Sequence, residues 1–337
     1  MMRTARWLPI IAGACLIGAL LAALILWQTA GPAETVASTA EKKSAAADRP
    51  VIARHTYLKI MTVNISFSAL DAPAYRWRKR RALLVKILLR HAPDIIGMQE
   101  SSAPQTAYLA AHLKGYAHVP SGAGLGSPMP LGIGLSRVNT IFYQRRRFAL
   151  IHQQHGPLRP RHLQPDPTEN AYYTMAVLRD RAAIFPLLVV VDTQLRHGNP
   201  NAAASAQRLD QVLRHQWRLD AGAGAIVMGD MNHSKTDTVV YDHLIGTHHA
   251  HGIHGRLRDS FDYAARPRGV LWGTWQQFIG KPVIKLPTDL IFTSRNLHAS
   301  PAAILRDHSP SGRYPTDHYL VETRITPLKK HAASPKQ

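Results

Sequence analysis

Cysteine is almost absent from this sequence: Cys15 is the only one, and it lies in the apolar N-terminal segment. An intrachain disulfide is therefore excluded, and the fold must be held together by its core. The 337 residues are enough for one α/β domain of about 250 residues. Because 45% of the residues are hydrophobic and only 18% are charged, a wholly disordered chain is excluded as well.

Acidic residues are also scarce. Asp and Glu number 21 against 41 Lys and Arg, which gives a formal net charge of +20. Most of the excess lies beyond residue 50, so it belongs to the folded part of the chain. Such a surface favours polyanionic partners, including nucleic acid, anionic lipid headgroups and phosphorylated sugars. The alternative is an evenly solvated basic surface with no specific partner.

A long hydrophobic run occurs only near the N-terminus. Arg3 and Arg6 precede an uncharged stretch from Trp7 to Trp27, close to the roughly 20 residues that cross a bilayer as a helix. The basic flank stays inside, so the rest of the chain faces the periplasm or the exterior. We predict a signal-anchor or transmembrane segment at 1–30 that holds the protein on the inner (plasma) membrane. The alternative is secretion after signal cleavage.

The remaining chain divides into three parts. Residues 31–55 are rich in Ala, Ser, Thr and charge without apolar periodicity, which is typical of a flexible linker. Residues 56–327 form the predicted folded domain, and 328–337 form a basic tail. Oligomeric state cannot be read from the sequence, and no obligate protein partner is inferred.

Strand patterns outnumber helix patterns in the folded part. Residues 57–66 predict a strand, 75–91 a helix and 94–99 a second strand that ends at Glu100, which together make an α/β unit. Further helices are predicted at 104–113 and 202–219. Further strands are predicted at 140–144, 173–178, 187–193, 225–228, 289–293 and 319–325.

Four short segments at or just beyond strand ends carry acids, amides and imidazoles. They are Met98-Gln99-Glu100, Gly229-Asp230-Met231-Asn232, Pro287-Thr288-Asp289-Leu290-Ile291-Phe292 and Thr316-Asp317-His318. Taken singly, each is typical of a helix cap or a solvated turn. Taken together at strand ends, they indicate one site.

With Asn64 at the end of the first strand, these segments resemble, in order, the motifs of the endonuclease/exonuclease/phosphatase superfamily. This group includes pancreatic-type deoxyribonucleases, abasic-site endonucleases, neutral sphingomyelinases and inositol-polyphosphate 5-phosphatases. The resemblance implies an α/β fold: a four-layer α/β/β/α sandwich in which two mixed β-sheets pack face to face with helices outside. It also implies a catalytic domain over 56–327, with its active site at one edge of the sheets.

Three residues are predicted to hold a metal ion. Glu100 supplies hard carboxylate oxygens, Asn64 helps to hold the same coordination shell, and Asp317 is the third member. Oxygen donors of this kind suit Mg²⁺, with Mn²⁺ as the alternative ion. A metal so placed would polarise a phosphoryl oxygen.

Four further residues are predicted to act on the substrate. Asp230 orients or deprotonates the attacking water, and the Asn232 amide donates a hydrogen bond to a phosphate oxygen. His318 binds phosphate or moves a proton, and Asp289 accepts from its other ring nitrogen. The alternative for His318 is a structural histidine beside a strand.

At one position the sequence departs from the resemblance. Where the superfamily usually carries Thr-His-Leu, this chain has Thr193-Gln194-Leu195, and Gln194 can bind phosphate but cannot give up a proton. His197 lies in a Gly/Pro-containing loop and is the candidate replacement acid. Otherwise the leaving group needs no strong acid, or the enzyme is slow.

Two other features each allow two interpretations. Asn139, at the start of the strand run Asn139-Thr140-Ile141-Phe142-Tyr143, is a candidate phosphate contact, with a strand cap as the alternative. The cluster His248, His249, His251 and His254 indicates a flexible insertion loop more than a metal site, because no partner acid stands at a regular ligand spacing.

The resulting hypothesis is an exported or membrane-anchored, Mg²⁺-dependent phosphoesterase that hydrolyses phosphodiester or phosphomonoester bonds. The basic surface favours nucleic acid slightly as the substrate. One alternative is a lipid phosphoesterase of sphingomyelinase or phosphoinositide-phosphatase type, which would follow from a location beside lipid headgroups. The other is a catalytically degenerate module that only binds polyanions.

Overall fold

The computed structural model describes residues 56–67, 72–119, 127–128, 136–158, 171–195, 201–220, 222–245, 257–263, 272–299 and 302–328. The predicted N-terminal segment, the linker and nearly all of the tail lie outside these ranges, so their bounds stay a prediction. Within these ranges, none of the helices is long and apolar enough to cross a membrane.

The first of two β-sheets is built around the strand that carries Asn64. Its strands follow the order β12-β14-β1-β2-β5-β3, with β13 added beside β14 and β4 beside β5. The bounds are β1 Leu58–Asn64, β2 Ile95–Ser101, β3 Tyr116–Val119, β4 Ser127–Pro128, β5 Ser136–Gln144, β12 Leu297–Ala299, β13 Ala303–Leu305 and β14 Leu320–Pro327. β1 pairs parallel with β2 and antiparallel with β14, so the sheet is mixed.

The second sheet has the order β10-β11-β9-β8-β7-β6. Its strands are β6 Phe148–Pro157, β7 Tyr172–Asp180, β8 Leu188–Gln194, β9 Gly224–Asp230, β10 Leu257–Asp259 and β11 Asp289–Ser294. β8 and β9 are parallel, whereas β9 and β11 are antiparallel. This sheet is therefore mixed as well.

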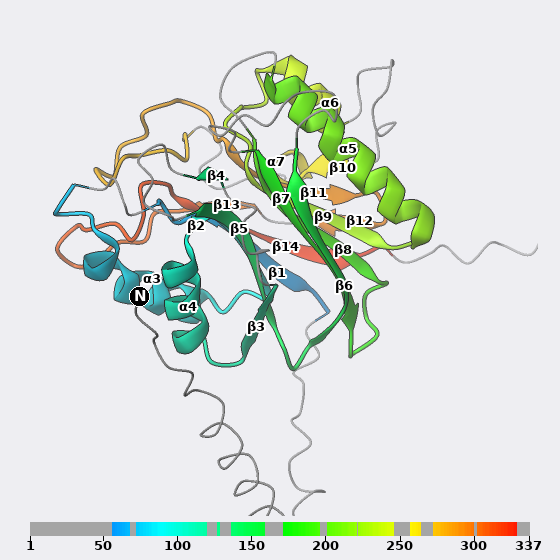
Figure 1. Cartoon of the computed structure of the whole chain (residues 1–337), viewed down its shortest axis with the longest axis horizontal. Helices are drawn as coiled ribbons and strands as arrows, with labels where there is room; N and C mark the ends of the chain where they lie inside the picture. Colours follow the sequence, from blue (N-terminus) through cyan, green and yellow to red (C-terminus); the bar gives the residue numbers. More distant parts are fainter. Residues whose placement is uncertain are drawn as a thin grey trace, which may run out of the picture. The chain divides into compact units, whose positions relative to one another are not determined.

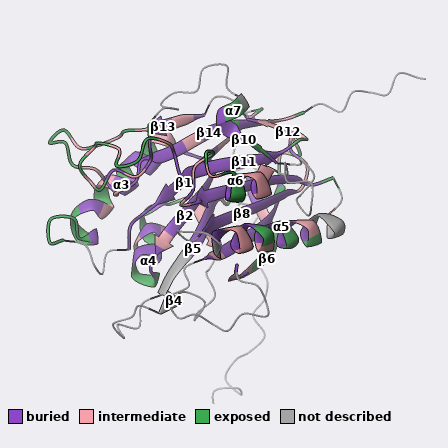
Figure 2. Cartoon of the chain, turned by 90° about the horizontal axis from the view of Figure 1, so that it is seen from above, coloured by how far each residue is buried: buried purple, intermediate pink, exposed green. Residues whose placement is uncertain are grey.

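Helices cover the outer faces of both sheets, which gives four layers (Figure 1). Helices α3 (Trp77–His91) and α4 (Ala103–His112) lie beside the first sheet, whereas α5 (Asn201–Leu219) and α6 (Thr238–Ile245) lie beside the second. A single turn, α7 (Ser260–Tyr263), follows β10. The central strands β1, β2, β8, β9 and β11 are almost wholly buried between the helical layers (Figure 2). The predicted four-layer α/β/β/α sandwich is confirmed.

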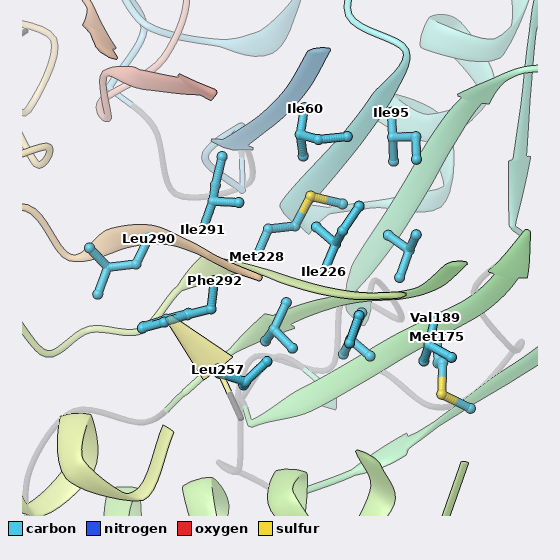
Figure 3. Packing of buried hydrophobic residues seen from close by; sticks show 14 of the residues in the cluster. Ile60, Ile95, Met175, Val189, Ile226, Met228, Leu257, Leu290, Ile291 and Phe292 are labelled. Atoms are coloured by element: carbon cyan, nitrogen blue, oxygen red, sulfur yellow. The ribbon is translucent and has the colours of Figure 1, made fainter. Parts of the chain in front are cut away.

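The alternation of side chains along β1 divides the core into two clusters. Leu58 and Ile60 belong to the large cluster that includes the second sheet, whereas Met61 and Val63 pack in the cluster with Leu84 of α3. Figure 3 shows Ile60 and Ile95 of the first sheet near Ile226, Met228 and Ile291 of the second. Both faces of β1 are therefore buried, which explains its nearly continuous apolar sequence.

The long strands and helices lie close to their predicted positions, and the elements missed by prediction are short or polar. Strand β6 has a mostly exposed central stretch, Ile151–Gln154, so it carries no apolar alternation. Strand β5 begins at Ser136, four residues before its predicted start at Thr140, which places Asn139 inside the strand.

The two sheets approach each other closely at Gly97 of β2. A Cβ atom added there would lie 2.6 Å from Asp192 Oδ1 and 2.9 Å from Met228 Cε, both of the second sheet. Asp192 is fully buried, and its Oδ1 accepts a hydrogen bond from Gln99 Nε2 at 2.5 Å. This polar contact between the sheets lies immediately behind Glu100, so the spacing at Gly97 bears on the position of the candidate site.

We expect Gly97→Ala to lower the free energy of unfolding by about 1–3 kcal/mol, because the sheets must separate to admit the methyl group. Urea denaturation of the purified protein measures the loss. The matched control is Gly156→Ala in β6, where the nearest atom, a ring carbon of Tyr173, lies 3.3 Å away. An equal, small effect of both changes would contradict the close packing at Gly97.

Candidate active site

The predicted site residues come together because both sheets end at the same edge. In the second sheet, Asp230 at the end of β9 stands between Gln194 of β8 and Asp289 of β11 in register. In the first sheet, Asn64 ends β1 beside Gln99 of β2. Asn64 Nδ2 donates a hydrogen bond to Asp230 Oδ2 at 3.1 Å, which joins the two sheets across the site.

A β-bulge brings Glu100 into this group. The register between β2 and β5 shifts between Met98 and Ser101, and Glu100 has a φ of 57°. A bulge of this kind re-aims one side chain out of the strand alternation. Glu100 Oε2 accepts from the Phe67 amide at 3.2 Å, and Oε1 accepts from Gln194 Nε2 at 2.9 Å. The carboxylate is thus held between the two sheets.

Hydrogen bonds hold Asp230 from several sides. Its Oδ1 accepts from the Asn232 amide at 3.0 Å, and Gln194 Nε2 lies 3.4 Å from its Oδ2. Burial and, second, the nearby Asp289 carboxylate raise the pKa of Asp230 to about 7, against the opposing effect of His318. Proton uptake at near-neutral pH is the ordinary property of a general base.

A glycine makes room for the end of β9. Gly229 has a φ of 150°, and a Cβ atom there would lie 1.8 Å from the carbonyl oxygen of Thr193 on β8. No residue with a side chain fits this approach. Gly229 in the Gly-Asp-x-Asn motif is therefore required by the packing of β8 against β9, immediately before Asp230.

His318 and Asp289 form a buried pair. His318 Nδ1 lies 2.8 Å from Asp289 Oδ2, and the backbone of His318 bridges to Trp275. Burial alone would lower the pKa of His318, but Asp289 and the neighbouring Asp230 raise it well above its ordinary value. Because Nδ1 is bonded to Asp289, Nε2 is the ring nitrogen that can serve a ligand.

Asn232 and Asn139 are both held by backbone carbonyls. Asn232 has a φ of 52°, and its Nδ2 donates to the Leu195 carbonyl at 2.7 Å. Asn139 is buried and donates through Nδ2 to the Tyr172 carbonyl at 2.6 Å, which joins β5 of the first sheet to β7 of the second. The phosphate contacts predicted for these two residues stay predictions.

The donor set of this site fits a divalent cation. Asp230, Asp289 and Asp317 lie within electrostatic reach of His318, and Glu100 lies within reach of Asp230 and Asp317. Asp289 Oδ1 is a buried oxygen without a hydrogen-bond partner. Burial raises the pKa of Asp317, and the Glu100 charge raises it further, so these two carboxylates lie within electrostatic reach of each other. Hard oxygen donors of this kind suit Mg²⁺ or Mn²⁺.

Two different groups of residues can be considered for that cation. Ligand atoms of Asp230, Asp289 and His318 all lie within 4.8 Å of one another, which matches a metal-binding group. However, Asp289 and His318 already bond to each other at 2.8 Å. Glu100 and Asp317, the ligands predicted from the sequence, form the second group, and their assignment stays a prediction. Asn64 Oδ1 accepts from the Ser66 amide at 3.0 Å, and this oxygen retains a second lone pair.

Sequence reasoning missed Arg80, a buried arginine beneath the site. Its guanidinium donates to the carbonyls of Ile65, Ser66 (2.7 Å) and Pro315 (3.3 Å), and its positive charge opposes the pKa increase of Asp317. Arg80 thus ties the segment after Asn64 to the one before Thr316-Asp317-His318. Its spacing from Trp77 and Leu84, on the apolar stripe of α3, was the signal for burial.

We expect Arg80→Met to lower the free energy of unfolding by roughly 3 kcal/mol, because it removes the donor from several buried carbonyls. Chemical denaturation with circular dichroism provides the measurement. Arg78→Met, an exposed position on the same helix, is the control and should change stability by about 0.5 kcal/mol or less. Similar stabilities of the two variants would contradict the inference that Arg80 ties these two segments together.

Some of the predicted residues cannot be placed. His197 and the cluster of His248, His249, His251 and His254 lie outside the described residues. The structure does place Gln194: its amide contacts both Glu100 and Asp230, at the position where a histidine was expected from the resemblance.

Comparison with known proteins agrees with this arrangement. The model of the "Endonuclease/Exonuclease/phosphatase family" matches residues 61–318. No curated protein sequence matches the chain significantly.

Solved structures similar to this chain include three that differ in activity or bound ligand. A mannosyl-6-phosphatase of Bacteroides thetaiotaomicron VPI-5482 is 20% identical, covers 80% of this chain and 99% of its own, and has a TM-score of 0.67. The human Nocturnin catalytic domain with bound sulfate is 20% identical, with coverages of 81% and 95% and a TM-score of 0.62. D. rerio TDP2 complexed with a single-strand DNA product is 16% identical, with coverages of 81% and 100% and a TM-score of 0.60.

Proposed function

Because the chain belongs to the endonuclease/exonuclease/phosphatase family, a family of hydrolases that act on phosphate esters, we propose that it hydrolyses phosphodiester or phosphomonoester bonds with Mg²⁺. The observation that carries the proposal is the convergence of Glu100, Asp230, Asp289–His318 and Asn64 at one edge of both sheets. A module that only binds polyanions would not require a buried carboxylate whose pKa is near 7.

The proposed roles follow from these contacts. Asp230 takes a proton from the attacking water, and Asn64 and the Asn232 amide hold its carboxylate in place. His318, fixed by Asp289, presents Nε2 to a phosphate oxygen and stabilises the charge that develops there. Glu100 and Asp317, with Asn64, hold the cation. When bound, Mg²⁺ supplies Lewis-acid polarisation of the phosphoryl group.

The substrate class is proposed from charge. The net charge of +20 attracts polyanions, and nucleic acid is the first substrate to test. The similar TDP2 structure contains a single-strand DNA product, whereas another similar structure is that of a mannosyl-6-phosphatase. Both kinds of phosphate ester therefore belong in the assay.

Removal of the metal, Glu100→Gln and His318→Ala should each lower turnover by about 100-fold or more. The measurement is phosphate-ester hydrolysis by the full chain with Mg²⁺ or with EDTA, on DNA, RNA, a phosphosugar, sphingomyelin and phosphoinositides. Lys86→Gln, an exposed position on α3, is the control and should retain full activity. If all variants bind polyanions tightly and in a salt-sensitive manner but none shows turnover, the protein is a binding module and not an enzyme.

The origin of the leaving-group proton gives a separate test. If His197 supplies it in place of Gln194, His197→Ala should lower turnover of an alkyl phosphodiester by roughly 100-fold and leave a nitrophenyl ester almost unchanged. The aryl leaving group is a weak base and needs no proton. Equal effects on both substrates would assign His197 another role and indicate that the reaction proceeds without a strong acid.

We also propose that the N-terminal segment holds the domain on the outer side of the inner (plasma) membrane. The support is the uncharged stretch from Trp7 to Trp27 behind Arg3 and Arg6. The full chain should remain in the membrane fraction after alkaline carbonate extraction, and protease added to spheroplasts should digest its domain. Release of a shortened chain into the periplasm or medium would show signal cleavage instead.

A further inference from the structure

Exposed apolar side chains are concentrated on one face of the domain. The described part of the chain exposes nine large apolar side chains, and five of them belong to two neighbouring segments. We call these five the apolar patch: Tyr75, Trp272, Ile279, Val283 and Ile284. Ile279 is 59% exposed and Val283 45%. Clustering of this kind is typical of an interaction surface.

Contacts within the fold bring these residues together. The ring of Tyr75 stacks on that of Phe278, with centroids 4.5 Å apart, which joins the segment before α3 to the 272–286 segment. Val283 donates its amide to the Trp275 carbonyl at 2.8 Å, so the 272–286 segment folds back on itself. In Figure 2 the loops beside α3 are coloured as exposed. The patch is thus one surface and not a set of scattered side chains.

The same segments also position the candidate site. The amides of Gln276 and Gln277 donate to the carbonyl of Asp317, and Gln276 Nε2 donates to that of Thr316 at 2.6 Å. Trp275 bridges to His318. A ligand that covers the apolar patch is therefore held next to the Asp317–His318 segment.

Among the described residues, the two segments that form the patch carry only basic charge. Residues 72–80 and 272–286 contain no Asp or Glu, and their exposed basic residues are Arg76, Arg78, Lys79, Lys281 and Lys285. Arg313 is exposed nearby, beside Tyr314, whose ring lies against Gly280. Asp307, the acid of the adjoining segment, bonds to Arg90 and His91. The partner must therefore offer anionic groups around an apolar interior.

We propose that the apolar patch docks on the surface of an anionic lipid bilayer. Transfer of aliphatic side chains such as Ile279, Val283 and Ile284 from water into the acyl boundary is favourable, and the surrounding Lys and Arg bind lipid phosphates. The phosphates of a nucleic acid would pair with the Lys and Arg side chains, but its polar surface offers exposed aliphatic side chains nothing to pack against. A bilayer satisfies both features at once. The proposal does not depend on the phosphoesterase activity.

A fluorescent label at the patch tests this in the full chain. In a Cys15→Ser background, Ile279→Cys carries an environment-sensitive dye such as NBD, and Val239→Cys on α6, also exposed, carries it in the control. The chains are reconstituted into vesicles of phosphatidylcholine alone or mixed with phosphatidylglycerol. We expect a blue shift and a several-fold rise in emission at position 279 with the anionic vesicles, and no change at position 239.

Changes in charge sharpen the test. Lys281→Gln with Lys285→Gln should lower the docking equilibrium by roughly 25-fold, since each lysine near an anionic surface contributes about fivefold. The emission of the label at position 279 would then be that of a dye exposed to water. Three results would overturn the proposal: identical emission in both vesicle types, a change produced by single-stranded oligonucleotide instead of lipid, and a change that follows protein concentration without lipid, which would indicate a second copy.

Discussion

The crowding of carboxylates at the shared edge of two β-sheets is the constraint on which the site depends. Asp230 and Asp289 are neighbours in one sheet, Glu100 comes from the other, and Asp317 precedes the final strand. Burial is the main cause of the raised pKa of Asp230, and repulsion from the nearby Asp289 and Glu100 carboxylates adds to it. Positive charge from His318 relieves this repulsion at Asp230 and Asp317, and Arg80 relieves it at Asp317; the proposed cation would relieve it further.

The two sheets that carry these groups are held together at the site by hydrogen bonds between them. The Asn64–Asp230 bond and the Gln194–Glu100 bond both cross from one sheet to the other. Behind them, Gln99 reaches the buried Asp192 of the second sheet. A site assembled from two packed sheets takes its geometry from the packing of those sheets.

Much of this arrangement was predictable from local sequence signals. Glu100 and Asp230 each stand at the end of a buried apolar run, and His318 stands just before one, so these positions indicated the edge at which the site forms. The bulge at Glu100 and the burial of Arg80 were not predicted. Both depend on contacts between segments far apart in the chain, and a helical arginine is ordinarily exposed.

The apolar patch was also not predicted, for a related reason. Ile279, Val283 and Ile284 stand between Gly, Pro and Lys residues in a segment without helical or strand periodicity. Apolar residues in such a segment are equally consistent with burial under a loop. Only the folded chain shows that they stay exposed while the neighbouring Gln276 is buried against Thr316.

The central claim is that the gathered carboxylates hold one divalent cation. Isothermal titration of Mg²⁺ into the full chain and into Asp317→Asn tests it without relying on turnover. The account predicts a single site in the wild-type chain and at least about tenfold weaker affinity in the variant, because one charged ligand is lost. Equal affinity in both chains, or no site in either, would contradict it.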